Sequence, residues 1–272
     1  MPELICICTV DLEQRLAEFN RMLRSLPPEV TLVTVLRGEA KLPPETAALL
    51  PANSHITTVE AASLSHARNV ALDLIACLGL EPLSVVAFPD DDCTWDPRTA
   101  DAIQRAFSRS EASLVIGRYR PWDADFELPR YPDVPGALTP RVILDRCASI
   151  VTFTRLGIAL ALRFDEQLGV GAPLPSGEDT DFALRVLALG GPGLYEPDIV
   201  CFHRYESAPD PRRRAVSGYI MARHLFRFPK LLIPLSRYLG RRVVVGPSRA
   251  HALGLVALGL RDAARPSLRA AR

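Results

Sequence analysis

The sequence predicts an α/β fold in which a mostly parallel sheet is flanked by helices. In the first half of the chain, short apolar runs rich in β-forming residues alternate with amphipathic segments of helical period. The chain has 272 residues, of which 48% are hydrophobic and 23% charged, as in ordinary globular proteins with a sizeable core. Alternation of this kind indicates a parallel sheet covered on both faces.

The first strand and helix are predicted at the N-terminus. Leu4–Val10 is an apolar run typical of a buried strand, and Asp11 begins a D-x-x-Q pattern that resembles a capping box ending at Gln14. Pro27 and Pro28 end the helix that follows. Its apolar positions at helical spacing are Leu12, Leu16, Phe19, Leu23 and Leu26.

Four more strands and two more helices complete the predicted first half. We expect strands at 30–36, 55–59, 83–88 and 112–117, and helices at 65–78 and 98–107. Ser65 is the predicted N-cap of the first of these helices. Its inward residues are predicted to be Ala67, Ala71, Leu74, Ile75 and Leu78. Ligands of such sheets bind at the carboxyl ends of the strands, so the residues after 83–88 are the first to consider.

Charge is divided unevenly along the chain. Residues 1–202 hold 17 Lys and Arg against 28 Asp and Glu, a net charge of −11, whereas residues 203–272 hold 15 against 3, a net charge of +12. We therefore predict a basic amphipathic helical tail at 206–272 that meets something anionic. Leu253, Val256, Ala257 and Leu260 recur at helical spacing within it.

Two uses of this tail stay open. Basic amphipathic helices lie on anionic membrane surfaces, and the same helices could instead pack on the catalytic domain or form a homodimer. No nucleic-acid recognition module is visible, so we expect no nucleic-acid partner.

The cysteines and the apolar runs indicate the compartment. The six cysteines form no C-x-x-C pair, which disfavours a zinc site and fits free thiols in a reducing cytoplasm. No signal peptide is recognisable, and no apolar run reaches the roughly 18–20 residues of a spanning helix. We expect a cytoplasmic protein, either free or peripheral on the inner face of the plasma membrane.

Three consecutive aspartates, Asp90, Asp91 and Asp92, follow the strand predicted at 83–88. Like charges this close repel one another and raise each other's pKa. Either water solvates them in an open loop or a cation binds there. Carboxylate oxygens suit Mg²⁺ or Mn²⁺, which often bridge one or two carboxylates and a substrate diphosphate.

Two further motifs accompany the triplet, namely SLSHARNVAL at 63–72 and FDEQLGVGAPLPSGEDTDFALR at 164–185. The order and spacing of the three resemble family-2 glycosyltransferases of the GT-A fold, over roughly residues 4–205. The resemblance implies a Rossmann-like sheet and an inverting, nucleotide-sugar-dependent enzyme. It also implies a catalytic domain at 1–205, with a nucleotide-sugar-binding half at 1–117 and an acceptor and catalytic half at 118–205.

The resemblance places the donor on the first half. Thr9 would contact the base, Arg68 would face the nucleotide unless it is a helix-surface arginine, and Asn69 would hold the loop. Asp90 would touch the ribose or uracil side, with Asp91 behind it. Arg37 departs from the family pattern, in which an acidic turn contacts the nucleotide, because arginine accepts no hydrogen bond from a base. The donor nucleotide therefore stays open.

The metal and catalytic roles also follow from the resemblance. Asp92 would bind Mn²⁺ or Mg²⁺, and His203 would be a further ligand or a structural histidine. Asp179 would be the general base and Glu178 would orient the acceptor, although acids in the first turn of a helix also suit its dipole. For Asp181 the dipole explanation is favoured. This helix is predicted to run from about Glu178 to Leu189, with Phe182, Val186 and Leu189 facing inward.

The acceptor side is predicted from small and aromatic residues. Gly177 ends a small-residue stretch, beginning at Gly169, that would let backbone approach the sugar. Trp122 and Tyr131 would stack on an acceptor sugar or pack within their loop.

The predicted function is metal-dependent, inverting transfer of a sugar from a nucleotide diphosphate sugar to a hydroxyl of a saccharide or lipid-linked acceptor, in bacterial-type polysaccharide or glycoconjugate synthesis. Two alternatives remain. One is a non-catalytic sugar- or partner-binding subunit of a polysaccharide assembly. The other is a Mg²⁺-dependent nucleotidyl or phosphoryl transferase, which would want a glycine-rich phosphate loop that the first strand lacks.

Overall fold

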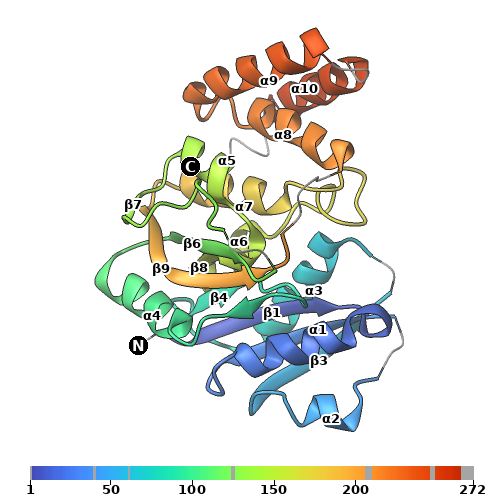
Figure 1. The fold of residues 1–272 in the computed structure, drawn as a ribbon, viewed down its shortest axis with the longest axis vertical. Helices are drawn as coiled ribbons and strands as arrows, with labels where there is room; N and C mark the ends of the chain where they lie inside the picture. The colour runs from blue at the N-terminus through green and yellow to red at the C-terminus, as the bar shows by residue number, and fades with distance from the viewer. Residues whose placement is uncertain are drawn as a thin grey trace.

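The computed structural model describes residues 2–38, 41–60, 62–123, 126–205, 210–245 and 249–264. Its centre is one mixed sheet with the strand order β3-β2-β1-β4-β8-β6-β9-β5, and β7 pairs with β9 (Figure 1). The strands of the first half are β1 (Leu4–Val10), β2 (Thr31–Arg37), β3 (Asn53–Val59), β4 (Val85–Ala87) and β5 (Thr94–Trp95). β1 to β4 are mutually parallel, which confirms the mostly parallel α/β fold.

Helices of the first half flank this sheet and carry the predicted apolar faces. They are α1 (Leu12–Ser25), α2 (Pro44–Ala47), α3 (Leu64–Leu78) and α4 (Thr99–Arg109). Phe19 and Leu23 of α1 and Ala71 and Ile75 of α3 are buried in the core, where removal of apolar surface from water stabilises the fold.

The second half adds antiparallel pairing to the parallel sheet. Its strands are β6 (Leu114–Pro121), β7 (Gly136–Ala137), β8 (Thr152–Arg155) and β9 (Gly193–His203). β8 lies between β4 and β6 and runs antiparallel to both, whereas β6 and β9 are parallel. The helical elements here are α5 (Pro140–Arg146), η1 (Ser149–Val151), α6 (Leu156–Leu162) and α7 (Glu178–Ala188).

Beyond β9 the described chain is helical. The elements are α8 (Pro211–Arg223), η2 (Pro229–Leu231), α9 (Leu232–Val245) and α10 (Arg249–Ala263), and they form a layer at the end of the molecule opposite α2 (Figure 1). Val216 and Ile220 of α8 belong to the same core cluster as the sheet. Residues 206–209, 246–248 and 265–272 of the predicted tail lie outside the described residues.

The residues at helical spacing in the last helix divide between exposed and buried positions. Leu253 and Leu260 are 47% and 37% exposed. The inward face lies about one residue away and contains Ala252, Leu255, Val256 and Ala263.

Three smaller predictions are also corrected. The side chain of Asp11 accepts no capping hydrogen bond, and Ser63 rather than Ser65 is the N-cap of α3, where it accepts from His66 N. Leu189 is 43% exposed rather than inward, because α7 ends at Ala188 and Gly190 takes a left-handed conformation with φ 87°.

The six cysteines are free thiols, as expected. No helix within the described ranges combines the length and apolar character that crossing a membrane requires.

Candidate active site

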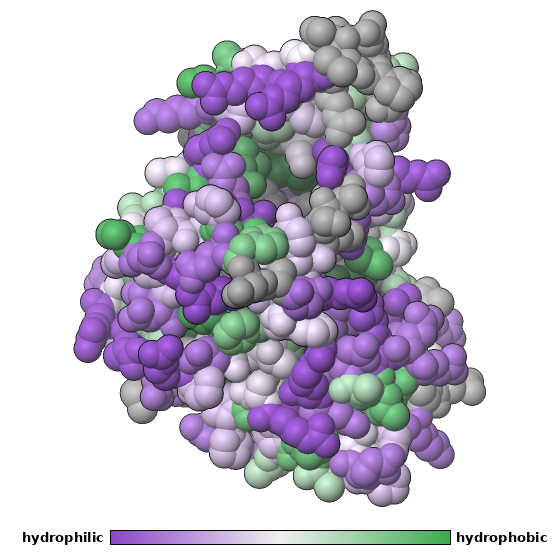
Figure 2. All heavy atoms as spheres, in the orientation of Figure 1, coloured by the Kyte–Doolittle hydropathy of each residue, from purple (hydrophilic) through white to green (hydrophobic). Residues whose placement is uncertain are grey.

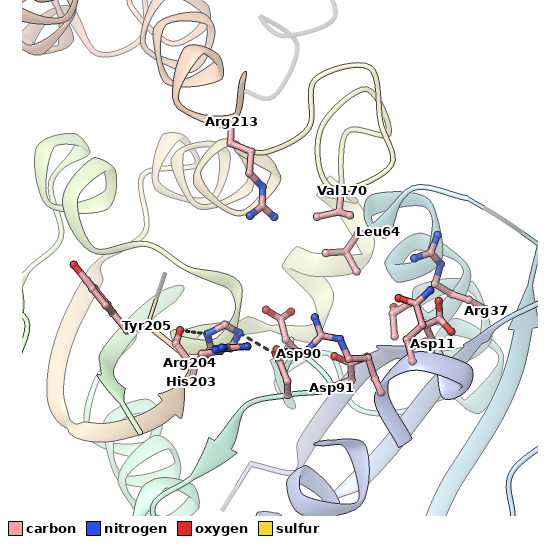
Figure 3. Close-up of a pocket in the computed structure, with 14 residues that line it drawn as sticks. Asp11, Arg37, Leu64, Asp90, Asp91, Val170, His203, Arg204, Tyr205 and Arg213 are labelled. Carbon is pink, nitrogen blue, oxygen red and sulfur yellow. Dashed lines mark hydrogen bonds and ion pairs between the residues drawn. The ribbon is translucent and has the colours of Figure 1, made fainter. Parts of the chain in front are cut away.

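A pocket of about 740 Å³ lies at the carboxyl ends of the strands (Figure 3). Thr9 comes from the end of β1, Arg37 from the end of β2 and His203 from the end of β9. The aspartate triplet follows β4, and Arg213 points into the pocket from α8. The topology thus brings together residues that are up to about two hundred positions apart, as expected for a ligand site in such a sheet.

Two members of the triplet have specific partners. Asp92 lies 2.9 Å from His203 Nε2 and 3.1 Å from Arg15 Nη1. Asp90 lies 3.1 Å from Arg68 Nη2 and accepts a hydrogen bond from Ser149 Oγ at 3.3 Å.

Asp91 is the member of the triplet whose pKa is raised most clearly. Burial, reinforced by the charges of Asp92 and Asp90, raises the pKa of Asp91 to about 7. Burial also disfavours charge on Asp92, but the hydrogen bond and charge of His203 and the charge of Arg15 outweigh it and lower the pKa of Asp92.

Asp90, Asp92 and His203 are arranged as a cation site would need. One ligand atom from each lies within 4.8 Å of the others. His203 Nδ1 is 2.8 Å from the carbonyl oxygen of Arg204, so Nε2 is the nitrogen that faces Asp92. Two carboxylate oxygens and one imidazole nitrogen fit Mn²⁺ well and Mg²⁺ adequately.

Protonation of His203 would compete with such a cation. Burial disfavours the imidazolium, but the hydrogen bond and charge of Asp92 prevail and raise the pKa of His203 to about 9. Because a ligating imidazole must be neutral, a metal would have to displace that proton.

Arg68 is not a helix-surface arginine, because its side chain is only 2% exposed. It is not among the described residues that line the pocket, and its contact with the nucleotide stays a prediction. It lies under the cleft between two carboxylates, bonded to Asp90 and with Nη1 at 3.7 Å from Glu178 Oε1. Arg68 therefore positions both acids.

Thr9 and Arg37 line the pocket together. Thr9 Oγ1 is buried and has no hydrogen-bond partner within the described part of the chain. A buried hydroxyl without a partner at a pocket wall is suited to bind a polar ligand group.

A second cavity of about 440 Å³ adjoins the first and contains Glu178 and Asp179. The two cavities share the lining residues Asp90, Val170, His203 and Arg213. Burial raises the pKa of Glu178 to about 7, with a further contribution from Asp179, and burial also raises the pKa of Asp179. Carboxylates with raised pKa values are suited to general base catalysis near neutral pH.

The glycine-rich loop before α7 is fastened to the start of α3. Leu64 N donates to Val170 O at 2.9 Å, and Ser65 Oγ donates to Leu168 O at 2.6 Å. Asn69 makes a reciprocal pair of hydrogen bonds with the backbone of Phe164, at 3.0 and 2.8 Å. Asn69 therefore holds this loop, as predicted, and two of the three sequence motifs are in direct contact.

Asp181 has a structural position in the first turn of α7. It is fully buried and lies 2.7 Å from Arg185 Nε, 2.9 Å from His224 Nε2 and 3.4 Å from Arg223 Nε. Burial opposes its ionisation, but Arg185, His224 and Arg223 outweigh it and hold the pKa of Asp181 well below its usual range. Asp181 thus ties α7 to α8 rather than merely meeting the helix dipole.

Among the described residues, Gly177 is the only predicted acceptor residue that lines a cavity of the site. Gly177 lines the second cavity, with φ 85°, and a Cβ there would meet Ile220 Cγ1 at 3.1 Å, so its size also serves packing on α8. Trp122 is not among the described residues that line either cavity, and Arg21 lies 4.2 Å from its ring centre. Tyr131 is buried and stacks on Tyr195, which is loop packing.

Three residues of the site were not predicted from the sequence. Arg15 lies at a kink in α1, Ser149 lies in η1 and Arg213 comes from α8. Their contacts with the triplet or the pocket form only in three dimensions. The basic run at 212–214 was the one available signal, and it was assigned to the tail.

Comparison with known proteins gives structural matches only. No protein-family model and no curated protein matches the chain in sequence. The structure resembles that of Staphylococcus aureus TarS residues 1–349, with a TM-score of 0.63 and 15% identity over 99% of this chain and 87% of that one. The complexes of the same protein with UDP-GlcNAc and with UDP give TM-scores of 0.61 and 0.64 at 16% and 15% identity, each over 100% of this chain and 87% of that one. Likeness at this level shows the shared fold.

Proposed function

We propose that the protein is a nucleotide-sugar-dependent glycosyltransferase that acts with inversion. One observation carries the proposal: a cluster of possible metal ligands lies in one cavity, and a pair of acids with raised pKa values lies in a second cavity that shares lining residues with the first. The fold is shared with TarS, whose structures hold UDP-GlcNAc and UDP, which supports a nucleotide sugar as the donor. Uridine diphosphate sugars are accordingly the first donors to test.

The larger pocket would bind the donor diphosphate. Asp90, Asp92 and His203 would hold Mn²⁺ or Mg²⁺, and the bound ion would neutralise charge on the departing nucleoside diphosphate. Arg213 projects into the same pocket and adds positive charge from the protein itself (Figure 3). Thr9 would offer its unpartnered hydroxyl to the nucleotide.

The smaller cavity would bind the acceptor hydroxyl. Asp179 would accept the proton of that hydroxyl while its oxygen attacks the anomeric carbon of the sugar, and the bond to the nucleoside diphosphate would break on the opposite face. Glu178, held by Arg68, would orient the acceptor. A single attack of this kind inverts the anomeric configuration.

The helical layer also favours a peripheral position on an anionic membrane, where a lipid-linked acceptor would be found. Phe226, Leu232 and Ile233 are 65%, 58% and 58% exposed near the turn between α8 and α9. The exposed cations Arg227 and Lys230 lie in the same stretch. Basic and apolar residues together are typical of surfaces that contact anionic lipid.

Calorimetry with UDP-GlcNAc in MnCl₂ and in EDTA tests the proposal, followed by a screen of other nucleotide sugars for release of nucleoside diphosphate. Metal-dependent binding with transfer supports it. Binding without turnover on any acceptor would favour a non-catalytic subunit, and release of pyrophosphate would favour a nucleotidyl transferase. Proton NMR of the first-formed glycoside tests inversion, and retention would contradict Asp179 as the base.

A further inference from the structure

A third cavity, of about 710 Å³, lies between α5, α8 and α9. It reaches the second cavity through the common residues Ser176, Gly177, Asp179, Arg214 and Ser217. Figure 2 shows a hollow at the level of α8, with hydrophobic side chains in its depth and hydrophilic ones along its upper rim. Asp179, the proposed base, lines both the second cavity and this third one.

Four arginines from three helices line the cavity. They are Arg141 of α5, Arg214 of α8, and Arg237 and Arg241 of α9. Arg141 is paired with Asp145 at 2.9 Å, but none of the ion pairs between described residues involves Arg214, Arg237 or Arg241. The four arginines outnumber the two acids that also line the cavity, Asp145 and Asp179, so the cavity is electrostatically suited to an anion.

Part of the cavity wall is apolar. Leu144, Ile220, Met221 and Pro234 are among the lining residues. Ile220 and Met221 are buried, so this part of the wall belongs to the packed interior. A charge pair that forms against an apolar wall is screened less than one in open solvent.

We infer that this cavity binds a phosphate group of the acceptor and so holds the attacking hydroxyl at Asp179. The inference rests on the proposed function, and it adds the chemical class of the acceptor. Guanidinium groups pair with phosphate oxygens in charge-assisted hydrogen bonds, whereas a neutral saccharide would leave all three arginines without a partner. The phosphate could belong to a lipid-linked acceptor or to a water-soluble phosphorylated one.

Titration of phosphate probes tests the inference. The donor pocket is first filled with UDP and Mn²⁺, and then glycerol phosphate, octyl phosphate and uncharged glycerol are titrated by calorimetry. We expect one or both of the phosphates to bind and glycerol not to bind. Binding of both identifies the phosphate alone as sufficient, and binding of octyl phosphate alone identifies a lipid-linked source. If neither phosphate binds the wild-type protein, the inference is wrong.

Substitutions locate the binding. Arg237→Gln with Arg241→Gln should weaken phosphate binding at least about tenfold, since two charge-assisted contacts are removed. Arg105→Gln with Arg109→Gln is the matched control, because these two arginines are also exposed and four residues apart, on α4. Equal phosphate affinity in the two double variants would overturn the inference.

Two further measurements separate this inference from the proposed function. First, the affinity for UDP in the presence of Mn²⁺ should be the same in both double variants. Second, if the wild-type protein does not bind UDP, the proposed donor site is wrong rather than the phosphate site. Should the α9 variant melt early, Arg214→Gln on α8 replaces it, with the same expected direction.

Discussion

The sheet body and the helical layer face each other across one cleft with opposite charge. Residues 1–202 carry a net charge of −11 and residues 203–272 a net charge of +12. The body supplies the carboxylates, including Asp92 and Asp179, and the layer supplies Arg213 and Arg214. The two signs of charge therefore suit separate roles. The acids suit cation binding and proton transfer, and the arginines suit anionic ligands.

The two regions also differ in how they are packed. The body has one continuous core, whereas the buried cluster that the layer forms by itself consists of Met221, Ala222, Leu235 and Val256. So small a cluster contributes little stability alone. The layer therefore depends on its contact with the body, through α8 and the buried Asp181.

The largest expected effect is on turnover, and it tests whether the body alone does the chemistry. Asp179→Asn keeps the shape of the side chain but removes the base, so turnover should fall at least about a hundredfold with donor affinity retained. Asp101→Asn is the matched control, because Asp101 is an exposed acid in the first turn of α4. Similar turnover in the two variants would show that Asp179 is not the base and only interacts with the helix dipole.

The second largest expected effect is on stability, and it tests the contact between α7 of the body and α8 of the layer. Asp181→Asn leaves Arg185, Arg223 and His224 without their buried carboxylate, so the free energy of unfolding should fall by roughly 3 kcal/mol at pH 7. Thermal melts of this variant beside Asp198→Asn, which changes an exposed carboxylate, measure the difference.

The pH dependence of that difference has a definite sign. The pKa of Asp181 is lower in the folded than in the unfolded chain, where it is about 3.9. Its contribution to stability is therefore complete above about pH 4 and is lost as the pH falls toward the folded pKa. The two melting curves should converge in acid, and a constant gap would show that charge is not the cause.

The third effect tests the acidic wall of the donor pocket. Asp92→Asn should weaken metal-dependent binding of the donor at least about tenfold, a loss seen as the difference between titrations in MnCl₂ and in EDTA. The sequence alone predicts that removing a charge from the triplet relieves repulsion and leaves the melting temperature unchanged or raised. Because Asp92 is paired with Arg15 and His203, we now expect the melting temperature to fall slightly. If donor affinity survives both the substitution and EDTA, the proposal that a metal binds at Asp92 is wrong.

The smallest effect concerns the outer face of the layer. Phe226→Ser with Ile233→Ser should reduce sedimentation with vesicles of anionic lipid a few-fold, since each buried apolar side chain contributes to insertion. Leu83→Ser is the control, because Leu83 is 70% exposed on the body. If the wild-type protein ignores such vesicles at low salt and forms dimers by sedimentation velocity, this face instead pairs two copies of the chain.

The sequence predicted the elements whose signals are local. β1 was predicted with its observed bounds, and the bounds of α3 and α7 were predicted within about one residue. Buried strands and amphipathic helices can be recognised from the periodicity of their apolar residues. β8 was missed, because a short antiparallel strand between two parallel ones is specified by its neighbours. The buried face of α10 was not predicted, because it includes small residues such as Ala252 whereas Leu253 is exposed.

The candidate site divides in the same way. Motif order pointed to Asp90, Asp92 and Asp179, and the structure places His203 beside Asp90 and Asp92 from more than one hundred residues away. The burial of Arg68 was not foreseen, since nothing in its helix indicates a pair of carboxylates on either side. Long-range contacts of this kind are set by the fold rather than by local pattern.

The place of α8 in the core has a consequence for biosynthesis. Val216, Tyr219 and Ile220 are buried in the same cluster as the first strand, and His224 contacts Asp181. A nascent chain that has emerged only as far as β9 still lacks one wall of its core and the arginines of its cleft. We therefore expect a protein cut after residue 205 to be less stable than the full chain, because the apolar surface that α8 covers would be exposed to water. An engineered chimaera that replaces the helical layer would therefore have to keep these buried contacts of α8 with the body.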